Sequence, residues 1–363
     1  MTNKNMTNKK GVAIIGYGGM GGWHTDHAAK SDTVTLCGVY DILEERRELA
    51  KSKGFFAYDS EAAVLADPNV EIVVVVTPND SHKAISIRAM EAGKNVICEK
   101  PVVMACADLQ DIFDVANRTG KLFSVHQNRR WDVDYLAMKQ LRDSGEIGEI
   151  FNVESRIHGS RGIPSDWRGE KEFGGGMMYD WGVHLIDQVL MIFAGETITD
   201  LYCRLDYITS NFITETECDN GFRMIIGFAS GAYAHIEVGT YNFVSMPRFY
   251  LRGSKGTAII HDWREKCQIT ACTAWHENDV LPIQTAAGLT KTMAPRDDVT
   301  TRTYEIDRPV SDVHDYYRNF CTAVDGKAQS FVQHDQLMRT LRLIELSFES
   351  HAKGEVLKFE MKI

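Results

Sequence analysis

The 363-residue sequence contains no long hydrophobic run, since no apolar stretch approaches the roughly 18 residues of a membrane span. It also lacks an excess of basic residues: 40 lysines and arginines against 50 acidic residues give a formal net charge of -10. This balance argues against nucleic acids and anionic membranes as partners. Residues 1–10 lack the apolar core of a signal peptide and repeat MTNK, so we expect a disordered tail there.

The eight cysteines show neither a CxxC pair nor another spacing typical of a metal site. Cys37 and Cys98 lie in apolar, strand-like runs, where free cysteine packs as a small hydrophobic residue. We therefore expect a cytoplasmic protein with reduced cysteines. Cys267 and Cys272 could join in principle, but a reducing compartment disfavours that bond.

The chain is too long for one ordinary core, which favours two domains. In the first third, short apolar runs alternate with stretches of helical spacing, and the four valines at 73–76 are typical of a strand covered on both faces. This alternation predicts an α/β domain with a doubly wound parallel sheet over residues 11–128. The expected strands are residues 11–17, 34–41, 71–77, 95–100 and 121–127.

Residues 129–363 show a different pattern, typical of a large, mostly antiparallel sheet with a few helices on one face. The turn residues at 219–221 and 230–231 predict hairpins. Because no proline- or serine-rich linker separates the halves, we expect them to pack together with a cleft between them. Helices are expected from about residue 180 and over 311–325 and 334–352, and a long loop over 275–305.

The stretch GYGGMG, residues 16–21, directly follows the first expected strand and opens a helix. G-x-G-x-x-G alone is a weak signal and could mark a flexible turn, but in this context its glycines let backbone amides approach a pyrophosphate. Asp41 ends the second strand 20 residues after Gly21, where an acid holds the ribose hydroxyls. Alternatively, Asp41 caps the next helix. Its charge would repel a 2′-phosphate, so we expect NAD as the cofactor and not NADP.

The stretch NVICEKPV, residues 95–102, places a lysine at the end of an apolar strand. The strand should stop there, because Pro101 cannot donate to a sheet ladder and keeps the preceding residue extended. Another strand ends at TPN, residues 77–79. Ligands of open parallel sheets bind beyond the carboxyl ends of the strands. We therefore expect Lys100 to point into the cofactor site, whereas an exposed amine is the usual alternative.

Two segments carry a resemblance to a known family. Residues 77–103 follow a T-P-N…H…A-G-K-x-V…E-K-P pattern, and residues 166–187 follow W-R…G-G-G…D-x-G-x-H-x-x-D. In both, the chain resembles the glucose-fructose oxidoreductase and inositol dehydrogenase family, often written Gfo/Idh/MocA. The resemblance covers nearly the whole chain. It implies a Rossmann domain followed by an α/β domain with a broad open sheet, oxidation of a sugar or polyol hydroxyl by a nicotinamide, and homo-oligomers formed through that sheet.

The resemblance also implies roles for single residues. Lys100, Asp180 and His184 match the family's catalytic lysine, aspartate and histidine. For the substrate we expect contacts from these three and Trp167, and we add Arg156 and His158 because their strand could lead into the cleft. The expected cofactor site comprises Gly16, Tyr17, Gly18, Gly19, Met20, Gly21, Asp41, Thr77, Pro78, Asn79, His82, Glu99, Lys100, Gln127, Trp167 and Arg168.

The expected chemistry is alcohol oxidation, in which a hydride goes to the nicotinamide and a proton goes to a base. Histidine suits that proton transfer near neutral pH. Asp180 and His184 are one helical turn apart, so the carboxylate can orient the histidine and stabilise its protonated form. Lys100 would stabilise negative charge on the reacting oxygen. The pair could instead be a plain helix ion pair or zinc ligands, but no third ligand has convincing spacing, so we expect no metal.

Three functions remain open from the sequence. The favoured one is a reversible sugar or polyol dehydrogenase, acting on the C3 hydroxyl of a glucose unit or glucoside, or on an inositol. An NAD-dependent glycoside hydrolase would oxidise only transiently and release a free aglycone. A non-catalytic sensor of NAD and sugar is disfavoured by the retention of Lys100, Asp180 and His184. The sequence of residues 275–305 suggests no subfamily, and the sugar stays undetermined.

Overall fold

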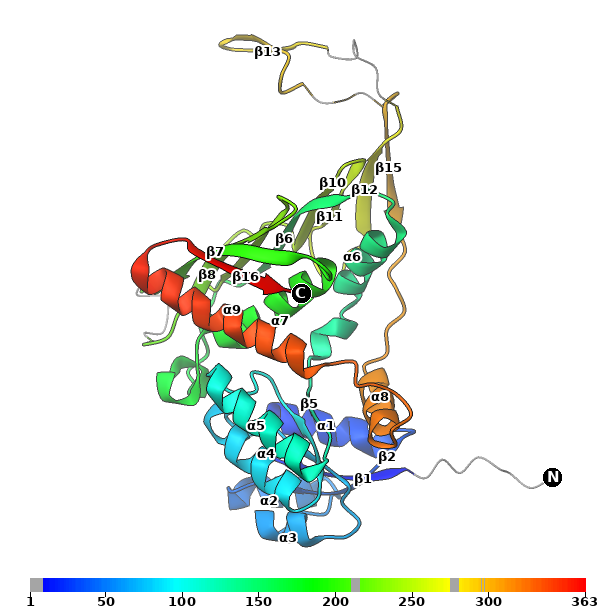
Figure 1. Cartoon of the computed structure of the whole chain (residues 1–363), viewed down its shortest axis with the longest axis vertical. Helices are drawn as coiled ribbons and strands as arrows, with labels where there is room; N and C mark the ends of the chain where they lie inside the picture. Colours follow the sequence, from blue (N-terminus) through cyan, green and yellow to red (C-terminus); the bar gives the residue numbers. More distant parts are fainter. Residues whose placement is uncertain (1–8, 210–215, 275–280, 295, 297) are drawn as a thin grey trace, which may run out of the picture.

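The computed structural model describes residues 9–363 except 210–215, 275–280, 295 and 297. Two sheet-containing units lie one above the other (Figure 1). The expected tail falls almost entirely outside the described residues, and the first strand begins at Lys10. None of the helices in the described ranges combines the length and apolar character needed to cross a bilayer.

The first unit is a five-stranded parallel sheet in the order β2-β1-β3-β4-β5, as expected for a doubly wound domain. All four residues of β3 are fully buried, as predicted from the run of valines for a strand covered on both faces. The strands are β1 (Lys10–Ile15), β2 (Val34–Tyr40), β3 (Ile72–Val75), β4 (Asn95–Cys98) and β5 (Phe123–Val125). The helices between them are α1 (Gly19–Lys30), α2 (Glu44–Ser52), α3 (Glu61–Ala66), α4 (His82–Glu91) and α5 (Cys106–Thr119).

A helix from near the end of the chain completes this first core. α8 (His314–Val324) lies beside the first unit in Figure 1. Its residues Tyr316, Tyr317 and Phe320 are buried in the same hydrophobic cluster as the parallel sheet. The carboxyl-terminal part of the chain therefore contributes to both units.

The second unit is a nine-stranded sheet in the order β15-β12-β11-β10-β6-β9-β8-β7-β16. Among the described strands of this sheet, β6 and β9 are the one parallel pair, and the other neighbours are antiparallel. Helices α6 (Val133–Ser144), α7 (Val183–Ile192) and α9 (His334–Lys353) lie on one side of it (Figure 1). The strands are β6 (Ile150–His158), β7 (Thr197–Asp206), β8 (Gly221–Phe228), β9 (Tyr233–Gly239), β10 (Phe249–Gly253), β11 (Gly256–Ile260), β12 (Cys267–Cys272), β15 (Thr301–Ile306) and β16 (Leu357–Lys362).

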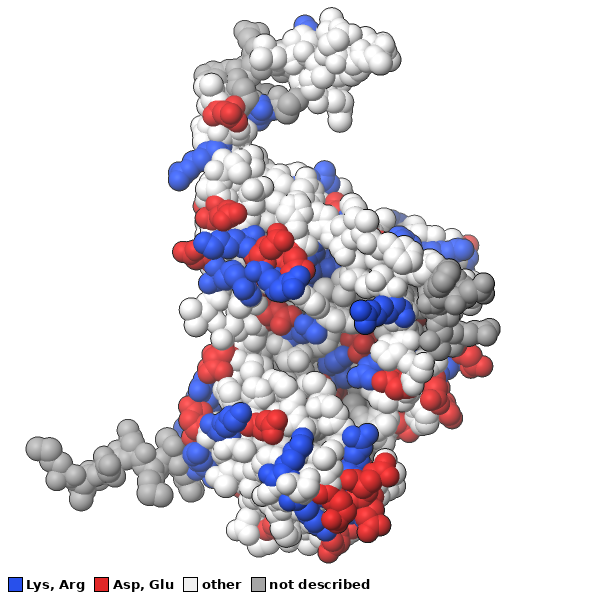
Figure 2. All heavy atoms as spheres, turned by 180° about the vertical axis from the view of Figure 1, so that it is seen from behind, with Lys and Arg blue, Asp and Glu red and all other residues white. Residues whose placement is uncertain are grey.

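The segment expected to be a loop contains regular structure where it is described. β13 (Ile283–Thr285) and β14 (Gly288–Thr290) form a hairpin that projects beyond the sheet (Figure 1), and β15 begins at Thr301. Figure 2 shows that this projection has a mostly uncharged surface, whereas basic and acidic side chains intermingle over the body of that face. The side chains of β13 and β14 are exposed or half-buried, so their sequence lacks the alternation of apolar and polar residues that predicts a strand.

One of the two predicted hairpin turns is wrong. Ser230 and Gly231 do separate β8 from β9, but residues 219–221 form no tight turn, because β7 ends at Asp206 and β8 begins only at Gly221. Asp219 instead accepts a hydrogen bond from the backbone N–H of Met178, at 2.8 Å. Burial raises the pKa of this carboxyl to about 7. Asp219 thereby holds the start of the helical segment that carries Asp180.

Candidate active site

The glycine-rich turn between β1 and α1 is tightly packed on one side and open on the other. Gly16 has a φ of 100°, and a Cβ there would lie 2.3 Å from the carbonyl oxygen of Val76. At Gly21 a Cβ would lie 2.1 Å from the carbonyl oxygen of Gly16. Added Cβ atoms at Gly18 and Gly19 would meet nothing within 4 Å. This open side at a helix amino terminus fits a pyrophosphate.

Asp41, directly after β2, is tied to that turn. Its Oδ2 accepts the Tyr17 N–H at 2.7 Å, and its Oδ1 accepts the Leu43 N–H at 2.9 Å. The carboxylate thus also holds the residue before α2, in keeping with the alternative that Asp41 caps this helix. Each carboxylate oxygen can accept a further hydrogen bond, so ribose hydroxyls could bind as well. The Arg47 guanidinium donates to the carbonyl oxygens of Asp41 and Ile42.

The turn after β3 is held between the two units. The Asn79 side-chain amide donates to the carbonyl oxygen of Gly174, at 3.0 Å, which joins the first unit to the glycine segment of the second. His82 is fully buried, with its ring nitrogens 2.8 Å from the Thr77 carbonyl oxygen and 3.0 Å from that of Pro101. His82 therefore braces the turns that follow β3 and β4, and lies beneath them.

Lys100 reaches across to the second unit. Its Nζ donates to Oδ1 of Asp180 at 2.8 Å and to the carbonyl oxygen of Asp180 at 2.9 Å. The Nε of Arg168 lies 4.0 Å from the other oxygen of that carboxylate. Burial alone would raise the pKa of the Asp180 carboxyl, but Lys100, and then Arg168 and Arg129, hold it below its ordinary value. Asp180 is therefore an anion surrounded by cations.

His184 is buried beside this pair, with 4% of its surface exposed. Burial, followed by the charges of Lys100 and Arg129, lowers its pKa well below the usual value, so the imidazole is neutral near pH 7. Its Nδ1 has no hydrogen-bond partner within the described part of the chain. A neutral, unpaired imidazole beside an ammonium group can accept a proton from a bound hydroxyl.

Asp180 is expected to orient His184 and stabilise its protonated form, but among the described residues no hydrogen bond joins the two, and Asp180 binds Lys100 instead. The chain forms a π-helical turn over Met178–Gly182 before α7 begins at Val183. The expectation assumed regular α-helical spacing between residues 180 and 184, and the π turn changes their relative direction. The lysine therefore fixes the carboxylate.

Two arginine–tryptophan pairs flank Asp180. The Arg168 guanidinium lies 4.7 Å from the ring centre of Trp167, and that of Arg129 lies 4.1 Å from the ring centre of Trp181. Trp167 and Arg168 are among the residues expected from the sequence, whereas Trp181 and Arg129 are not. Arg129 lies just after β5, so the rule that ligands bind beyond the carboxyl ends of parallel strands could have identified it.

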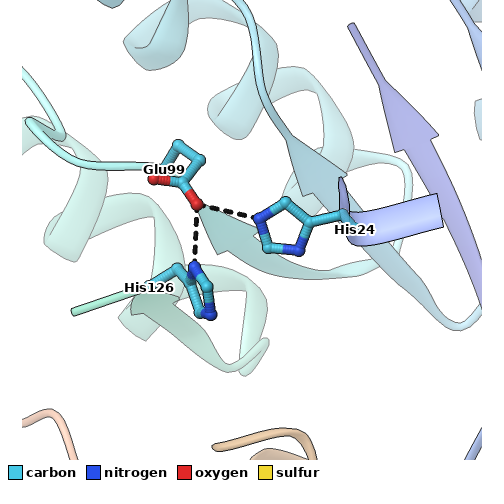
Figure 3. Close-up of side chains that lie close together, drawn as sticks. All are labelled: His24, Glu99 and His126. Atoms are coloured by element: carbon cyan, nitrogen blue, oxygen red, sulfur yellow. Dashed lines mark hydrogen bonds and ion pairs between the residues drawn. The ribbon is translucent and has the colours of Figure 1, made fainter. Parts of the chain in front are cut away.

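A buried network lies behind Lys100. Figure 3 shows His24 and His126 converging on Glu99, whose Oε1 is 2.8 Å from Nε2 of His24 and 2.7 Å from Nδ1 of His126. These side chains have the composition of a metal site. However, both histidines meet one oxygen at hydrogen-bond distance, whereas tetrahedral zinc ligands lie about 3.3 Å apart. We interpret the cluster as a hydrogen-bonded network that anchors Glu99, whose Oε2 accepts the Lys100 N–H.

Three further residues were predicted to contact the cofactor or the substrate. Gln127 is buried, and its Oε1 lacks a hydrogen-bond partner within the described ranges. Arg156 forms ion pairs with Glu154 and Glu237, and Nε2 of His158 lies 3.5 Å from Glu237. Strand alternation directs Arg156 and His158 away from the helix-covered face. The structure thus does not bring them together with the candidate catalytic residues, contrary to expectation.

Comparison with known proteins identifies the family of both units. Residues 10–127 match a family model described as an oxidoreductase family with an NAD-binding Rossmann fold, and residues 135–259 match the GFO/IDH/MocA C-terminal domain. The crystal structure of an NAD-binding protein from Listeria innocua is 44% identical, with a TM-score of 0.92 over 97% of this chain and 99% of that one.

Two curated relatives match over shorter stretches. An uncharacterized oxidoreductase from Schizosaccharomyces pombe is 32% identical over 232 residues, which are 60% of this chain and 62% of the relative. A scyllo-inositol 2-dehydrogenase (NADP(+)) from Bacillus subtilis is 31% identical over 188 residues, which are 50% of this chain and 51% of the relative. The alignments thus span between half and two thirds of these relatives.

Proposed function

Because the chain belongs to the Gfo/Idh/MocA oxidoreductase family, we propose that it is an NAD-dependent dehydrogenase that oxidises a secondary hydroxyl of a sugar, glycoside or polyol. The observation that carries this proposal is the contact of Lys100 with Asp180 beside the buried, neutral His184. These three side chains come from both units and lie at the carboxyl end of the parallel sheet, where such sheets bind ligands.

The cofactor-binding part of the proposal uses residues of the first unit. The turn from Gly16 to Gly21 would hold the pyrophosphate, and Asp41 would hold the adenosine ribose. NAD bound there would accept the hydride from the oxidised carbon. The negative charge of Asp41 supports NAD, although the Bacillus subtilis relative is named for NADP(+).

The remaining chemistry is assigned to this chain's own side chains. His184 would accept the hydroxyl proton, since its low pKa leaves it unprotonated near neutral pH. An ammonium group has three N–H donors, and two of those of Lys100 point to Asp180. The third would donate to the reacting oxygen and stabilise its developing negative charge. Asp180 would hold the ammonium in that position.

For the substrate, we propose the C3 hydroxyl of a glucose unit or glucoside, and an inositol is the alternative that the Bacillus subtilis relative's name favours. Mass spectrometry of products from glucosides, free sugars and inositols, with and without added NAD, tests both. A released 3-oxo-glycoside supports the first substrate and an inosose supports the second. Free aglycone without partner enzymes would indicate a hydrolase instead, and binding without turnover would indicate a sensor.

A further inference from the structure

A third tryptophan extends the candidate site outward. Trp263 lies in the segment between β11 and β12, and its ring centre is 6.0 Å from that of Trp181, with the planes inclined by 32°. The Trp181 ring centre is in turn 6.0 Å from that of His184. The Arg129 guanidinium lies 4.1 Å from the Trp181 ring centre and 5.9 Å from that of Trp263. Two aromatic rings thus lead away from the candidate base.

Solvent exposure rises along the same direction. His184 is 4% exposed, Trp181 is partly buried, and Trp263 is 41% exposed. The outer ring therefore retains a large apolar surface that a ligand could cover, and covering it would be favourable. Tryptophan is suited to this because it offers a large rigid face at a small entropy cost.

The charges around the site indicate a neutral ligand. Each nearby cation already has its own carboxylate: Lys100 pairs with Asp180, and the two arginines of the arginine–tryptophan pairs have theirs. The pairs are Arg129 with Asp132 at 2.9 Å and Arg168 with Asp166 at 2.7 Å. No surplus positive charge among these groups calls for an acidic substrate, whereas the C–H faces of a sugar or an aromatic ring suit the indole.

We propose that Trp263, supported by Trp181 and Arg129, forms a subsite that stacks on a second ring of the substrate. The proposal rests on the proposed dehydrogenase function and narrows its substrate class to glycosides. When the ring to be oxidised lies by His184 and Trp181, the next ring along reaches Trp263. That second ring is either an aromatic aglycone or a second sugar, which present the same kind of stacking face.

The competing explanation is that Trp263 only packs its segment against Trp181. Removing the ring would then lower stability or change turnover of all substrates equally. The two explanations are separated by comparing substrates with one ring and two. Methyl glucoside carries one ring, phenyl glucoside adds an aromatic ring, and a glucose disaccharide adds a second sugar.

The experiment measures kcat/KM for these three substrates in the wild type, Trp263→Ala and Trp263→Phe. We expect Trp263→Ala to lower kcat/KM about tenfold for a two-ring substrate, because a tenfold change corresponds to the energy of one aromatic contact. The loss should appear as a higher KM. Methyl glucoside should be nearly unaffected, and Trp263→Phe should restore much of the loss. Phe56→Ala, at an exposed aromatic residue of the first unit, is the matched control and should change nothing.

Calorimetric titration of the NAD-loaded protein with phenyl glucoside, the disaccharide and methyl glucoside keeps the subsite testable even if the wild type oxidises none of them. In that case the proposed function fails, but a two-ring preference in Kd that Trp263→Ala removes would still support the subsite. Equal losses for all ligands, or no loss for the two-ring ligands, would overturn it. The ligand that loses affinity, phenyl glucoside or the disaccharide, identifies the second ring.

Discussion

The ammonium group of Lys100 lies 2.8 Å from a carboxylate oxygen of Asp180, although 80 residues separate them in the chain. The lysine follows a strand of the parallel sheet, and the aspartate lies in a π-helical turn of the second unit. Their contact therefore joins the two units at the place where cofactor and substrate would meet.

Replacing Lys100 or His184 should strongly lower turnover while leaving NAD binding intact. We expect Lys100→Ala and His184→Ala each to lower kcat by about a hundredfold to a thousandfold, because each would lose a group that acts on the reacting hydroxyl. The double variant should be much less impaired than the product of the single losses, since both groups serve one proton transfer. Steady-state kinetics and NAD titration measure this.

Lys83→Ala is the matched control for that experiment. Lys83 also binds carboxylates, those of Asp108 and Asp111, but it lies on the surface of the first unit. Its replacement should leave kcat unchanged. Turnover of Lys100→Ala close to that of the wild type at every pH would rule out the proposed role of the lysine.

His184 should titrate at a lower pH than an ordinary histidine. Burial and the charge of Lys100 lower its pKa, so the neutral form persists below the usual value of about 6.5. Lys100→Met should raise that pKa, because it removes the nearby cation. NMR titration of ¹⁵N-labelled histidine in both proteins checks the direction. An unchanged His184 signal in Lys100→Met would show that the lysine charge does not act on the ring.

Asp41 should determine the choice of cofactor. We expect kcat/KM to be higher with NAD than with NADP, because the carboxylate would repel a 2′-phosphate. Asp41→Ser should narrow the gap by removing that charge, although it also removes the hydrogen bonds to Tyr17 and Leu43. Glu48→Ser, an exposed acid on α2, controls for a general loss of negative charge. Equal or better turnover of the wild type with NADP would refute the prediction.

The buried His24 should make the fold sensitive to acid. Burial, partly opposed by Glu99, lowers the pKa of His24 to about 4, whereas the unfolded chain titrates near 6.5. The unfolded state thus binds a proton first, so the His24 contribution is complete above pH 6.5 and is lost as the pH falls towards 4. We expect a loss of about 3 kcal/mol in the free energy of unfolding across this range.

Urea unfolding at a series of pH values measures that loss. His24→Gln should reduce the slope between pH 6.5 and 4, because glutamine does not titrate. His351→Gln, at the end of α9 and outside this buried network, serves as the control for replacing a histidine elsewhere in the fold. An identical slope in His24→Gln and the wild type would mean that other groups cause the acid sensitivity.

The protein should form homo-oligomers through the open face of the nine-stranded sheet. Phe151, Ile225 and Tyr233 on its strands are 42%, 46% and 38% exposed, and a second copy could cover them. Light scattering at micromolar concentration should report more than one chain per particle. Ile225→Glu should weaken that assembly, whereas Val310→Glu, at a 99% exposed residue outside the sheet, should not. A monomeric wild type would contradict this prediction.

Features that depend on neighbouring residues could be predicted from the sequence. The valine run predicted a strand buried on both faces, the glycines predicted the turn after β1, and Pro101 predicted that the strand before Lys100 would end there. The two-domain α/β fold is confirmed for the same reason, since strand and helix periodicity is written locally along the chain. Hairpin signals were less reliable. Asp219 is of a residue type common in turns, but its carboxylate accepts a hydrogen bond from the backbone N–H of Met178.

Which side chains meet depends on how the two units pack against each other. Sequence spacing suggested that Asp180 would orient His184. In the structure, Asp180 lies in a π-helical turn, and its carboxylate accepts a hydrogen bond from Lys100 of the other unit. Trp263, in the segment after β11, meets Trp181 of the π-helical turn, although 82 positions separate the two residues in the chain. Such contacts join residues far apart in the chain, and a change in helical phase redirects a side chain without changing its spacing in the sequence. They depend on how the elements pack, and local patterns carry no record of that.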